Sequence, residues 1–316
     1  MYNKKKIGVI SNYDINIHMQ NMISKSIKKE AEFEECQNYE YYDAVIVFNH
    51  PKQKVCVRVN PDKVFAFHQE PGNFFLHPYM YFKTNSYSRV YTPLNIKKEN
   101  AIVGPPFLPW HIDKNIDFLK SYAPTTKELK LSCISSNKRT LPGHKKRFKF
   151  VEYLKRSEIQ CDFYGKGYKY VEDKWNALNP YKYSIAIENE SIDNYFTEKI
   201  TDCFLSYTIP IYYGCKNITD YFPADAVIQI DITKTDKSIR KITEIIQSDD
   251  YDKRIKALIE ARNRVLNMYN PFQLVINIIK NDYSSDKKIQ TISIHPINKE
   301  LRIFLHLIHK FIRNFE

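Results

Sequence analysis

Short apolar runs rich in valine and isoleucine alternate along the chain with segments whose apolar residues recur at helical spacing. Runs of about four to eight such residues, bounded by polar segments, are typical of buried strands in parallel sheets. In the first part of the chain the pattern predicts strands at 6–10, 43–48, 55–59, 64–67 and 89–91 and a helix at 18–31. The alternation indicates an α/β fold with mainly parallel sheets.

The pattern is interrupted once. Prolines at 105, 106 and 109 are followed by a polar stretch over 113–127, which we interpret as a hinge between domains. Beyond it the alternation starts again, with strands predicted at 130–135, 161–164, 183–187, 209–213 and 226–230 and helices at 144–156 and 197–206. We therefore expect two Rossmann-like domains that face each other across a cleft, at 1–125 and 126–284, followed by a tail at 285–316.

Length and composition support this division. A chain of 316 residues exceeds the roughly 250 to 300 residues at which a single hydrophobic core stops growing. Hydrophobic residues make up 43% of it and aromatic residues 14%, which excludes a largely disordered protein. The net charge of +12 favours an anionic partner such as a phosphate-bearing substrate, an acidic membrane surface or nucleic acid. Neither zinc-finger spacing nor an RNP motif occurs, so we do not expect nucleic acid.

The cysteines and the apolar runs bear on the cellular compartment. The six cysteines are scattered without a CxxC pair, which is typical of buried free thiols in a reducing cytoplasm. The apolar run at 7–10 is too short for a signal-peptide core, and no later stretch reaches about 18 uninterrupted apolar residues. We therefore expect a cytoplasmic protein that does not cross a membrane.

A basic segment offers one candidate phosphate site. The seven glycines form neither a GxGxxG nor a GxxxxGK[ST] pattern, so a glycine cradle is not available. Instead, the segment 135–147 places five Lys and Arg residues, among them Lys138, Arg139 and Arg147, around a strand-to-helix turn. Cations at a helix start oppose the helix dipole at a cost of about 0.3 to 1 kcal/mol each, which a bound anion would reverse. A solvated basic face is the alternative interpretation.

A second candidate site follows the strand predicted at 183–187. This strand delivers Glu188 and Asn189 to its carboxyl end, and the next helix begins with Glu198 and Lys199. A threonine cap and a first-turn glutamate stabilise a helix start, whereas a first-turn lysine does not unless an anion lies opposite. The pair therefore indicates one residue for ligand hydroxyls, Glu198, and one for phosphate, Lys199.

The segments 181–189 (YKYSIAIEN), 195–199 (YFTEK) and 208–214 (TIPIYYG) resemble the donor-binding signature of the α1,3/α1,4-fucosyltransferases, glycosyltransferase family 10, in its bacterial form. The resemblance extends over about 131–231 and is loose over the first 125 residues. It implies a GT-B fold, with the acceptor bound mainly by the N-terminal domain and GDP-fucose mainly by the C-terminal one. The residues that match the family's nucleotide-sugar contacts are Asn189, Tyr195, Glu198 and Lys199, and Arg147 matches its phosphate-neutralising arginine.

The same resemblance places a catalytic carboxylate in the first domain. The segment 64–71 (VFAFHQEP) matches the strand end that holds the family's proposed base, which would be Glu70 or a residue one position away. His68 would orient a substrate or tune this carboxylate, although a packed or solvated histidine is the more common situation. The sequence Glu70-Pro71-Gly72 also fits a simple turn.

The implied mechanism needs no metal ion and no cofactor. A base takes the proton of the acceptor hydroxyl, and fixed cations stabilise the departing diphosphate. Arg147 and Lys199, with Lys138 or Arg139, would replace the divalent ion of other transferases. The competing metal-binding segment, 249–252 (DDYD), precedes a helical run at 253–268 and is better interpreted as the start of a helix.

The C-terminal tail carries an apolar stripe at helical spacing, flanked by basic residues: Ile297, Leu301, Phe304, Leu305, Ile308, Phe311 and Ile312. It would lie on the anionic inner face of the cytoplasmic membrane, pack back on a domain or form a dimer contact; the resemblance favours the membrane. The expected reaction transfers fucose from GDP-fucose to O3 or O4 of an N-acetylglucosamine or similar residue. The acceptor would be an oligosaccharide or lipid-linked precursor of a bacterial surface glycan such as lipopolysaccharide. The alternatives are a related transferase with another donor and a non-catalytic protein that binds nucleotide sugars or polyanions.

Overall fold

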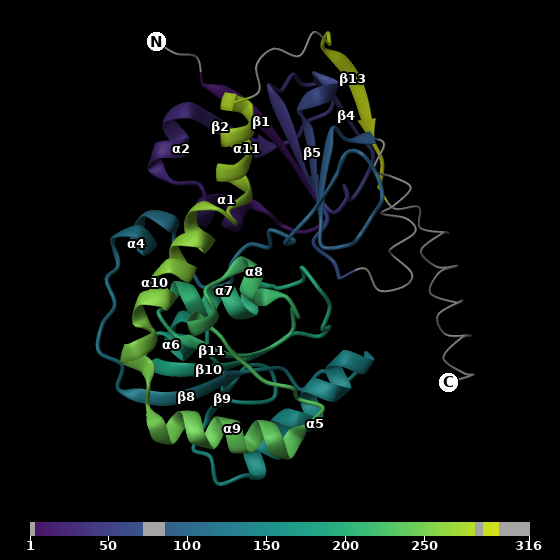
Figure 1. Ribbon diagram of the computed structural model, residues 1–316. Coiled ribbons are helices and arrows are strands. Elements are labelled where there is room, and N and C mark those ends of the chain that lie inside the picture. The colour runs from purple at the N-terminus through teal and green to yellow at the C-terminus, as the bar shows by residue number, and fades with distance from the viewer. Residues whose placement is uncertain (1–3, 72–85, 282–286, 297–316) are drawn as a thin grey trace, which may run out of the picture. The chain divides into compact units, whose positions relative to one another are not determined.

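The computed structural model describes residues 4–71, 86–281 and 287–296 and divides the chain into two compact units (Figure 1). Unit 1 comprises Met1–Phe107 and Pro271–Glu316, and unit 2 comprises Leu108–Asn270. The first boundary, after Phe107, therefore lies within the predicted hinge, which begins at Pro105 and extends to residue 127, and the last part of the chain returns to unit 1. The predicted boundaries at 125 and 284 differ from both positions.

Unit 1 is built on a six-stranded parallel sheet with the order β2-β1-β3-β5-β6-β7. Its strands are β1 (Lys5–Ser11), β2 (Ala31–Glu35), β3 (Ala44–Phe48), β5 (Val64–Phe67), β6 (Arg89–Thr92) and β7 (Ala101–Val103). Strand β2 is added on one side of β1, and β3, β5, β6 and β7 are added in turn on the other side. The order of strands therefore reverses between β1 and β3, which is the switch point of the sheet. Open α/β sheets bind ligands beyond the carboxyl ends of the strands at such a point.

The predicted helix at 18–31 is two helices and the start of a strand. Helix α1 (Asn16–Met22) ends before Ser24, whose side chain accepts a hydrogen bond from the backbone of Ile27 and caps α2 (Lys25–Glu30). Strand β2 then begins at Ala31 and pairs with β1. Apolar residues keep their helical spacing on both sides of Ser24, so the sequence pattern does not show that one helix ends here and another begins.

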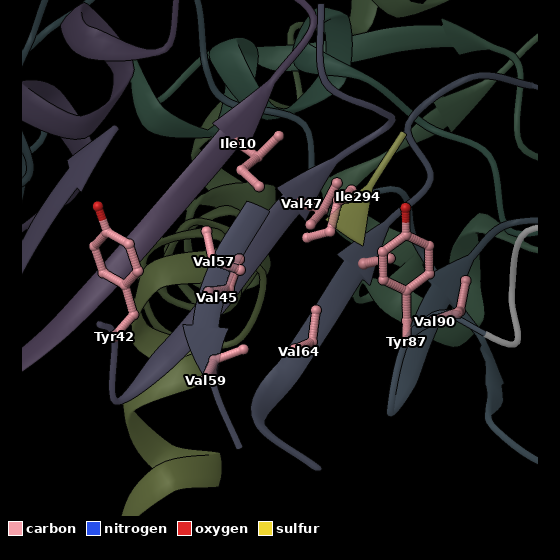
Figure 2. Packing of buried hydrophobic residues seen from close by; sticks show 11 residues of the cluster. Ile10, Tyr42, Val45, Val47, Val57, Val59, Val64, Tyr87, Val90 and Ile294 are labelled. Carbon is pink, nitrogen blue, oxygen red and sulfur yellow. The ribbon is translucent and has the colours of Figure 1, made fainter. Parts of the chain in front are cut away.

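A second layer covers one part of this sheet. Strand β4 (Val55–Val59) pairs antiparallel with β13 (Gln290–Ile294), and side chains from both join the apolar cluster of β3 and β5 (Figure 2). Ile294 is 1% exposed within this cluster. The segment predicted as the start of a tail at 285–316 therefore contains a strand of unit 1, while the apolar stripe from Ile297 onwards lies outside the described residues.

Helix α11 (Pro271–Asn281) also belongs to unit 1. The ring of Phe272 contacts those of Phe33 and Phe48, with centroids 5.3 and 6.0 Å apart, and Lys280 forms an ion pair with Glu30 at 2.6 Å. These contacts join residues more than 200 positions apart. Sequence periodicity does not report such contacts, so the segment 271–281 falls in the second of the two domains predicted from the sequence, whereas the structure places it in unit 1.

Unit 2 is built on a five-stranded parallel sheet with the order β12-β11-β10-β8-β9. Its strands are β8 (Leu129–Ile134), β9 (Asp162–Tyr164), β10 (Tyr181–Ile187), β11 (Ile209–Tyr213) and β12 (Ile228–Gln229). Its helices are α4 (Ile116–Ser121), α5 (Pro142–Arg156), α6 (Trp175–Leu178), α7 (Glu198–Leu205), α8 (Ile218–Tyr221), α9 (Thr235–Ser248) and α10 (Tyr251–Asn267). Short 3-10 turns lie at Pro61–Lys63 in unit 1 and at Ala224–Ala226 in unit 2.

The stretch predicted as a polar hinge contains α4. Ile116 and Leu119 are buried, and Asn115 caps the helix by accepting a hydrogen bond from the backbone of Phe118. Two buried positions three residues apart are enough to anchor a short helix to unit 2. Among the described residues, we find no helix with the length and apolar character needed to span a bilayer.

Candidate functional site

A pocket of about 260 Å³ opens in unit 2 beside the carboxyl ends of β8 and β10. Ser135 and Ser136 follow β8, Arg147 comes from the first turns of α5, and Glu198 and Lys199 come from the first turn of α7. The two strand-to-helix junctions that the sequence singled out therefore share one pocket. Their principal cations, Arg147 and Lys199, both line it.

Arg147 is a buried cation with neutral partners. It is 6% exposed and donates hydrogen bonds to the side-chain oxygen of Asn189 and, over 2.9 Å, to the hydroxyl of Ser136. Its Nε atom is buried without a partner, and among the described residues no carboxylate forms an ion pair with it. Burial lowers the pKa of the guanidinium, which nevertheless stays charged because arginine titrates far above neutral pH. A buried charge of this kind is costly without a counter-ion, so the pocket is suited to an anion.

Gly143 permits the close packing that positions Arg147. A Cβ atom at this position would lie 1.8 Å from the carbonyl oxygen of Asn189, so no residue with a side chain fits without a shift of the backbone. The start of α5 can therefore approach the end of β10 directly. Arg147, one turn further along the same helix, then reaches the side chain of Asn189.

Lys199 is a cation already paired with carboxylates. Its Nζ atom lies 3.1 Å from Glu188 and 3.3 Å from Glu198, and it donates a hydrogen bond of 2.9 Å to Thr197. Burial opposes its charge, but the attraction of the two carboxylates outweighs burial and raises the pKa of the ammonium. Thr197 caps α7, as the sequence predicted, by accepting a hydrogen bond from the backbone of Lys199.

Glu188 and Tyr195 do not line the pocket. The carboxylate of Glu188 is fully buried and accepts hydrogen bonds of 2.8 Å from both the backbone nitrogen and the hydroxyl of Thr197. It therefore fixes the start of α7. Burial raises the pKa of Glu188, against the pull of Lys199. Tyr195 is 7% exposed and lies just before this helix.

The outer basic residues of the first junction lie away from the pocket. Lys138 and Arg139 are exposed and do not line it. The guanidinium of Arg139 instead stacks over the ring of Phe148 at 3.7 Å. For these two residues the structure supports the interpretation as a solvated basic face.

Three charged pocket residues were not singled out from the sequence: Lys166, Lys174 and Asp202. Asp202 lies one turn after Glu198 on α7, which is a signal that helical spacing could have provided. Lys174 and Lys166 lie in loops, where no spacing rule applies. Their presence in the pocket follows from tertiary structure alone.

The candidate base and its histidine lie in unit 1, at the end of β5. The buried Gln69 is held by three hydrogen bonds: its backbone donates to Asn49 (2.8 Å), its amide donates to the carbonyl of Phe107 (3.1 Å), and Tyr13 donates to its side-chain oxygen (2.9 Å). Glu70 follows as an exposed residue. The surrounding protein nevertheless displaces enough water to raise the pKa of its carboxyl.

His68 is a packed histidine. It is 2% exposed, and burial lowers its pKa to about 4, so its imidazole is neutral at physiological pH. Its Nδ1 atom has no hydrogen-bond partner among the described residues. The structure therefore supports packing for His68 over direct contact with a substrate.

The acidic segment 249–252 is used in ion pairs. Asp249 ends α9 and pairs with Lys182 at 2.7 Å, and Asp250 pairs with Arg254 at 2.9 Å. Helix α10 begins at Tyr251, as expected for a helix start, although the Asp250 side chain makes no capping hydrogen bond.

Comparison with known proteins identifies the second unit. Residues 124–254 match the sequence model of the C-terminal domain of glycosyltransferase family 10 (fucosyltransferase). An α-(1,4)-fucosyltransferase of Arabidopsis thaliana is 39% identical over 62 residues, which are 18% of this chain and 16% of the relative. The α-(1,3)-fucosyltransferase FucT of Helicobacter pylori is 38% identical over 70 residues, 22% of this chain and 15% of the relative. These matches span about one sixth of the length of each relative.

Solved structures resemble the chain over most of its length. An α1,3-fucosyltransferase determined with GDP has a TM-score of 0.55 at 18% identity and covers 88% of this chain and 91% of its own. An α-glucosyltransferase in complex with UDP-glucose and DNA has the same TM-score at 9% identity, over 88% and 100% of the two chains. At such low identity these similarities establish the fold. They confirm the predicted α/β architecture of GT-B type.

The matched segment contains Arg147, strand β10 and the start of α7 with Glu198 and Lys199. The pocket described above therefore lies within the matched part of the chain. The second unit is therefore similar in sequence to the C-terminal domain of glycosyltransferase family 10 over residues 124–254.

Proposed function

We propose that this protein is an inverting fucosyltransferase that transfers fucose from GDP-fucose to a hydroxyl group of a carbohydrate acceptor. The observation that carries the proposal is the buried guanidinium of Arg147, which lines a pocket together with Lys199 and has neutral partners only. A structure of an α1,3-fucosyltransferase with GDP-fucose, similar in fold at a TM-score of 0.52 and 17% identity over 90% of this chain and 93% of its own, supports the choice of donor.

The pocket suits a departing diphosphate. When the bond between the sugar and the diphosphate breaks, negative charge builds up on the leaving group. Fixed cations stabilise this charge more in the transition state than in the bound substrate, and one such group contributes about 3 kcal/mol in comparable sites. Arg147 supplies a charge that no carboxylate of the described residues binds directly, with a planar set of donors, and Lys199 supplies a second charge. We propose that these cations make a divalent metal ion unnecessary.

Glu198 suits the hydroxyl groups of the donor. Its side chain is 14% exposed and lines the pocket. Burial opposes its ionisation, but the neighbouring Lys199, Lys174 and His111 outweigh burial and lower its pKa. It is therefore a permanent carboxylate acceptor for the ribose or fucose hydroxyls.

Activation of the acceptor is assigned to Glu70, or to a neighbour one position away. A general base works best when its pKa approaches the working pH, and the surroundings of Glu70 raise its pKa in that direction. We propose that the acceptor hydroxyl is O3 or O4 of an N-acetylglucosamine or similar residue in an oligosaccharide or lipid-linked precursor of a bacterial surface glycan.

A transfer assay tests the proposal. GDP-fucose is offered with a panel of N-acetylglucosamine-containing acceptors in the presence of EDTA, and NMR of the product reports the linkage and the anomeric configuration. Inverted product formed in EDTA is the expected result. Activity lost on chelation contradicts the metal-free mechanism, and turnover with a UDP sugar only contradicts the donor assignment.

The variant Glu70→Gln separates catalysis from binding. It should reduce turnover by at least about a hundredfold, because the amide cannot accept the proton, while the calorimetric affinity for GDP stays unchanged. Unaltered function of the variant would instead indicate a non-catalytic binding protein.

A further inference from the structure

Five side chains in unit 2 form a line of alternating charge along the start of α7. The order is Glu188, Lys199, Glu198, Lys174 and Asp202, and the successive distances between charged atoms are 3.1, 3.3, 3.8 and 3.2 Å. Three of the five come from α7, and Glu188 directly follows β10; all five lie within the segment that matches the family model. Lys174 comes from a loop and completes the line by bridging two carboxylates of α7.

The loop fixes Lys174 in place. Asp173, the preceding residue, accepts hydrogen bonds from Lys114 (2.5 Å) and from the backbones of Asp113 and Trp175 (3.0 and 2.9 Å). The ammonium of Lys174 is then held by Asp202, whose side chain is 2% exposed. The structure around Lys174 therefore restrains both its backbone and its charged group.

The other partners of Asp202 are also satisfied. Its second oxygen accepts a hydrogen bond of 2.9 Å from the backbone of His111, and its own helix places it one turn after Glu198. The ammonium of Lys174, which is bound to Asp202, also lies 3.8 Å from the carboxylate of Glu198, one turn earlier on α7. Glu198 thus lies between two ammonium groups and faces the pocket.

We propose that Lys174 is a positioning residue of the donor site, which acts by holding the carboxylate of Glu198 at the pocket wall between itself and Lys199. The inference rests on the proposed function, since it assumes that Glu198 receives hydroxyl groups of the nucleotide sugar. It assigns a role to a residue outside the recognisable sequence signature.

Calorimetric titration with GDP tests the role. Lys174→Met should weaken GDP binding about three- to tenfold, which is the effect expected for losing one partly buried ion pair, here that of Lys174 with Glu198. Lys174→Arg keeps the charge and should bind GDP within about twofold of the unaltered protein. The exposed Lys237→Met serves as control and should bind GDP normally.

A double-mutant cycle shows whether Lys174 acts through Glu198. In a Glu198→Gln background, the further change Lys174→Met should have little effect on GDP affinity, because the group that Lys174 positions is already altered. Full additivity of the two changes, or unchanged affinity of Lys174→Met alone, would overturn the proposal.

Loss of stability must be separated from loss of positioning. Lys174→Met leaves the carboxylate of Asp202 buried without its partner, which lowers thermal stability. The double variant Lys174→Met/Asp202→Asn removes this mismatch, so its thermal stability should recover while the GDP defect persists; recovery of both together would indicate a purely structural role. If the unaltered protein fails to bind GDP, the proposed function fails and this proposal with it. If the unaltered protein binds GDP and Arg147→Ala does not, the donor site is supported. The Lys174 variants then test the positioning role alone.

Discussion

Two cations of the same pocket differ in their environment. Arg147 has an amide and a hydroxyl as partners, whereas Lys199 lies between two carboxylates. The field of Lys199 at the pocket is therefore largely compensated before a ligand arrives. Arg147 should contribute more to the binding of an anion, even though both residues belong to the same set of predicted phosphate contacts.

Substitution of the two cations should reveal this difference. Arg147→Ala should weaken GDP binding by about 10- to 150-fold, as expected for loss of hydrogen bonds between charged groups, and Lys199→Ala by clearly less. Both changes should slow transfer. Lys145→Ala, an exposed position on the same helix, is the control. Equal calorimetric affinities of both variants and the unaltered protein would refute the phosphate assignment.

His68 supports a prediction about pH. Its pKa of about 4 in the folded state lies below the ordinary value of 6.5, so between these values the unfolded chain binds a proton that the folded protein does not. The stability of unit 1 should therefore fall by roughly 2 to 3 kcal/mol as the pH drops from 6.5 towards 4. Urea denaturation of His68→Leu should show a weaker fall over this range. The exposed His295→Leu should retain the full dependence, and identical profiles for His68→Leu and the unaltered protein would contradict the assignment.

Residues in continuous motifs could be predicted, and residues in loops could not. Arg147, Glu198 and Lys199 lie in the first turns of the helices that follow β8 and β10, and the topology of a parallel sheet dictates that such junctions meet at one edge. Lys174 enters the same pocket from a loop whose course depends on hydrogen bonds to Asp113 and Lys114. No local pattern encodes these contacts.

At the scale of elements, the valine- and isoleucine-rich runs identified most strands because a strand covered on both faces needs apolar residues throughout. Strand β3, with five buried residues in succession, is the clearest case. Strand β7 (Ala101–Val103) is apolar but only three residues long, which is too short a run to indicate a strand. Strand β13 was missed because three of its five residues are polar, so it does not form an apolar run.

The contact between α5 and β10 is the element pairing on which the pocket depends. Gly143→Ala would place a methyl group 1.8 Å from the carbonyl oxygen of Asn189, so α5 has to shift and carry Arg147 away from Asn189. The variant should lose about 1 to 3 kcal/mol of stability and bind GDP at least tenfold more weakly. Gly104→Ala meets no atom within 4 Å and should leave both quantities unchanged. Normal GDP affinity of Gly143→Ala would show that the pocket tolerates displacement of the helix.

At the scale of the whole molecule, the chain leaves unit 1 after Phe107 and returns to it at Pro271. The predicted division into consecutive domains followed from the order of apolar patterns, which cannot show that a late segment returns to an early sheet. The antiparallel pairing of β13 with β4 is such a return.

This arrangement sharpens the test of the membrane attachment predicted from the sequence of the tail. Removal of residues 297–316 takes away the apolar stripe and keeps β13, so the shortened protein should stay folded and lose sedimentation with vesicles rich in anionic lipid. Neutral vesicles are the control. Retained binding to anionic vesicles would assign the attachment to another part of the chain.

A cut further upstream should have a different result. Removal of everything after Asn281 also deletes Ile294 from the apolar cluster of unit 1 and the ion pair of Lys287 with Asp62 at 2.7 Å. Loss of a buried isoleucine typically costs about 2 to 5 kcal/mol, so the melting temperature should fall markedly relative to the shorter truncation. Equal melting temperatures would show that β13 contributes little to unit 1.

The return of the chain also sets an order of events on the ribosome. Every residue of unit 2 has been synthesised before Ile294, which completes the apolar cluster of unit 1, emerges. The nascent chain can therefore finish unit 2 while the sheet of unit 1 still exposes apolar surface, a state in which chaperones bind and aggregation begins. The half that is translated first is the last to be complete.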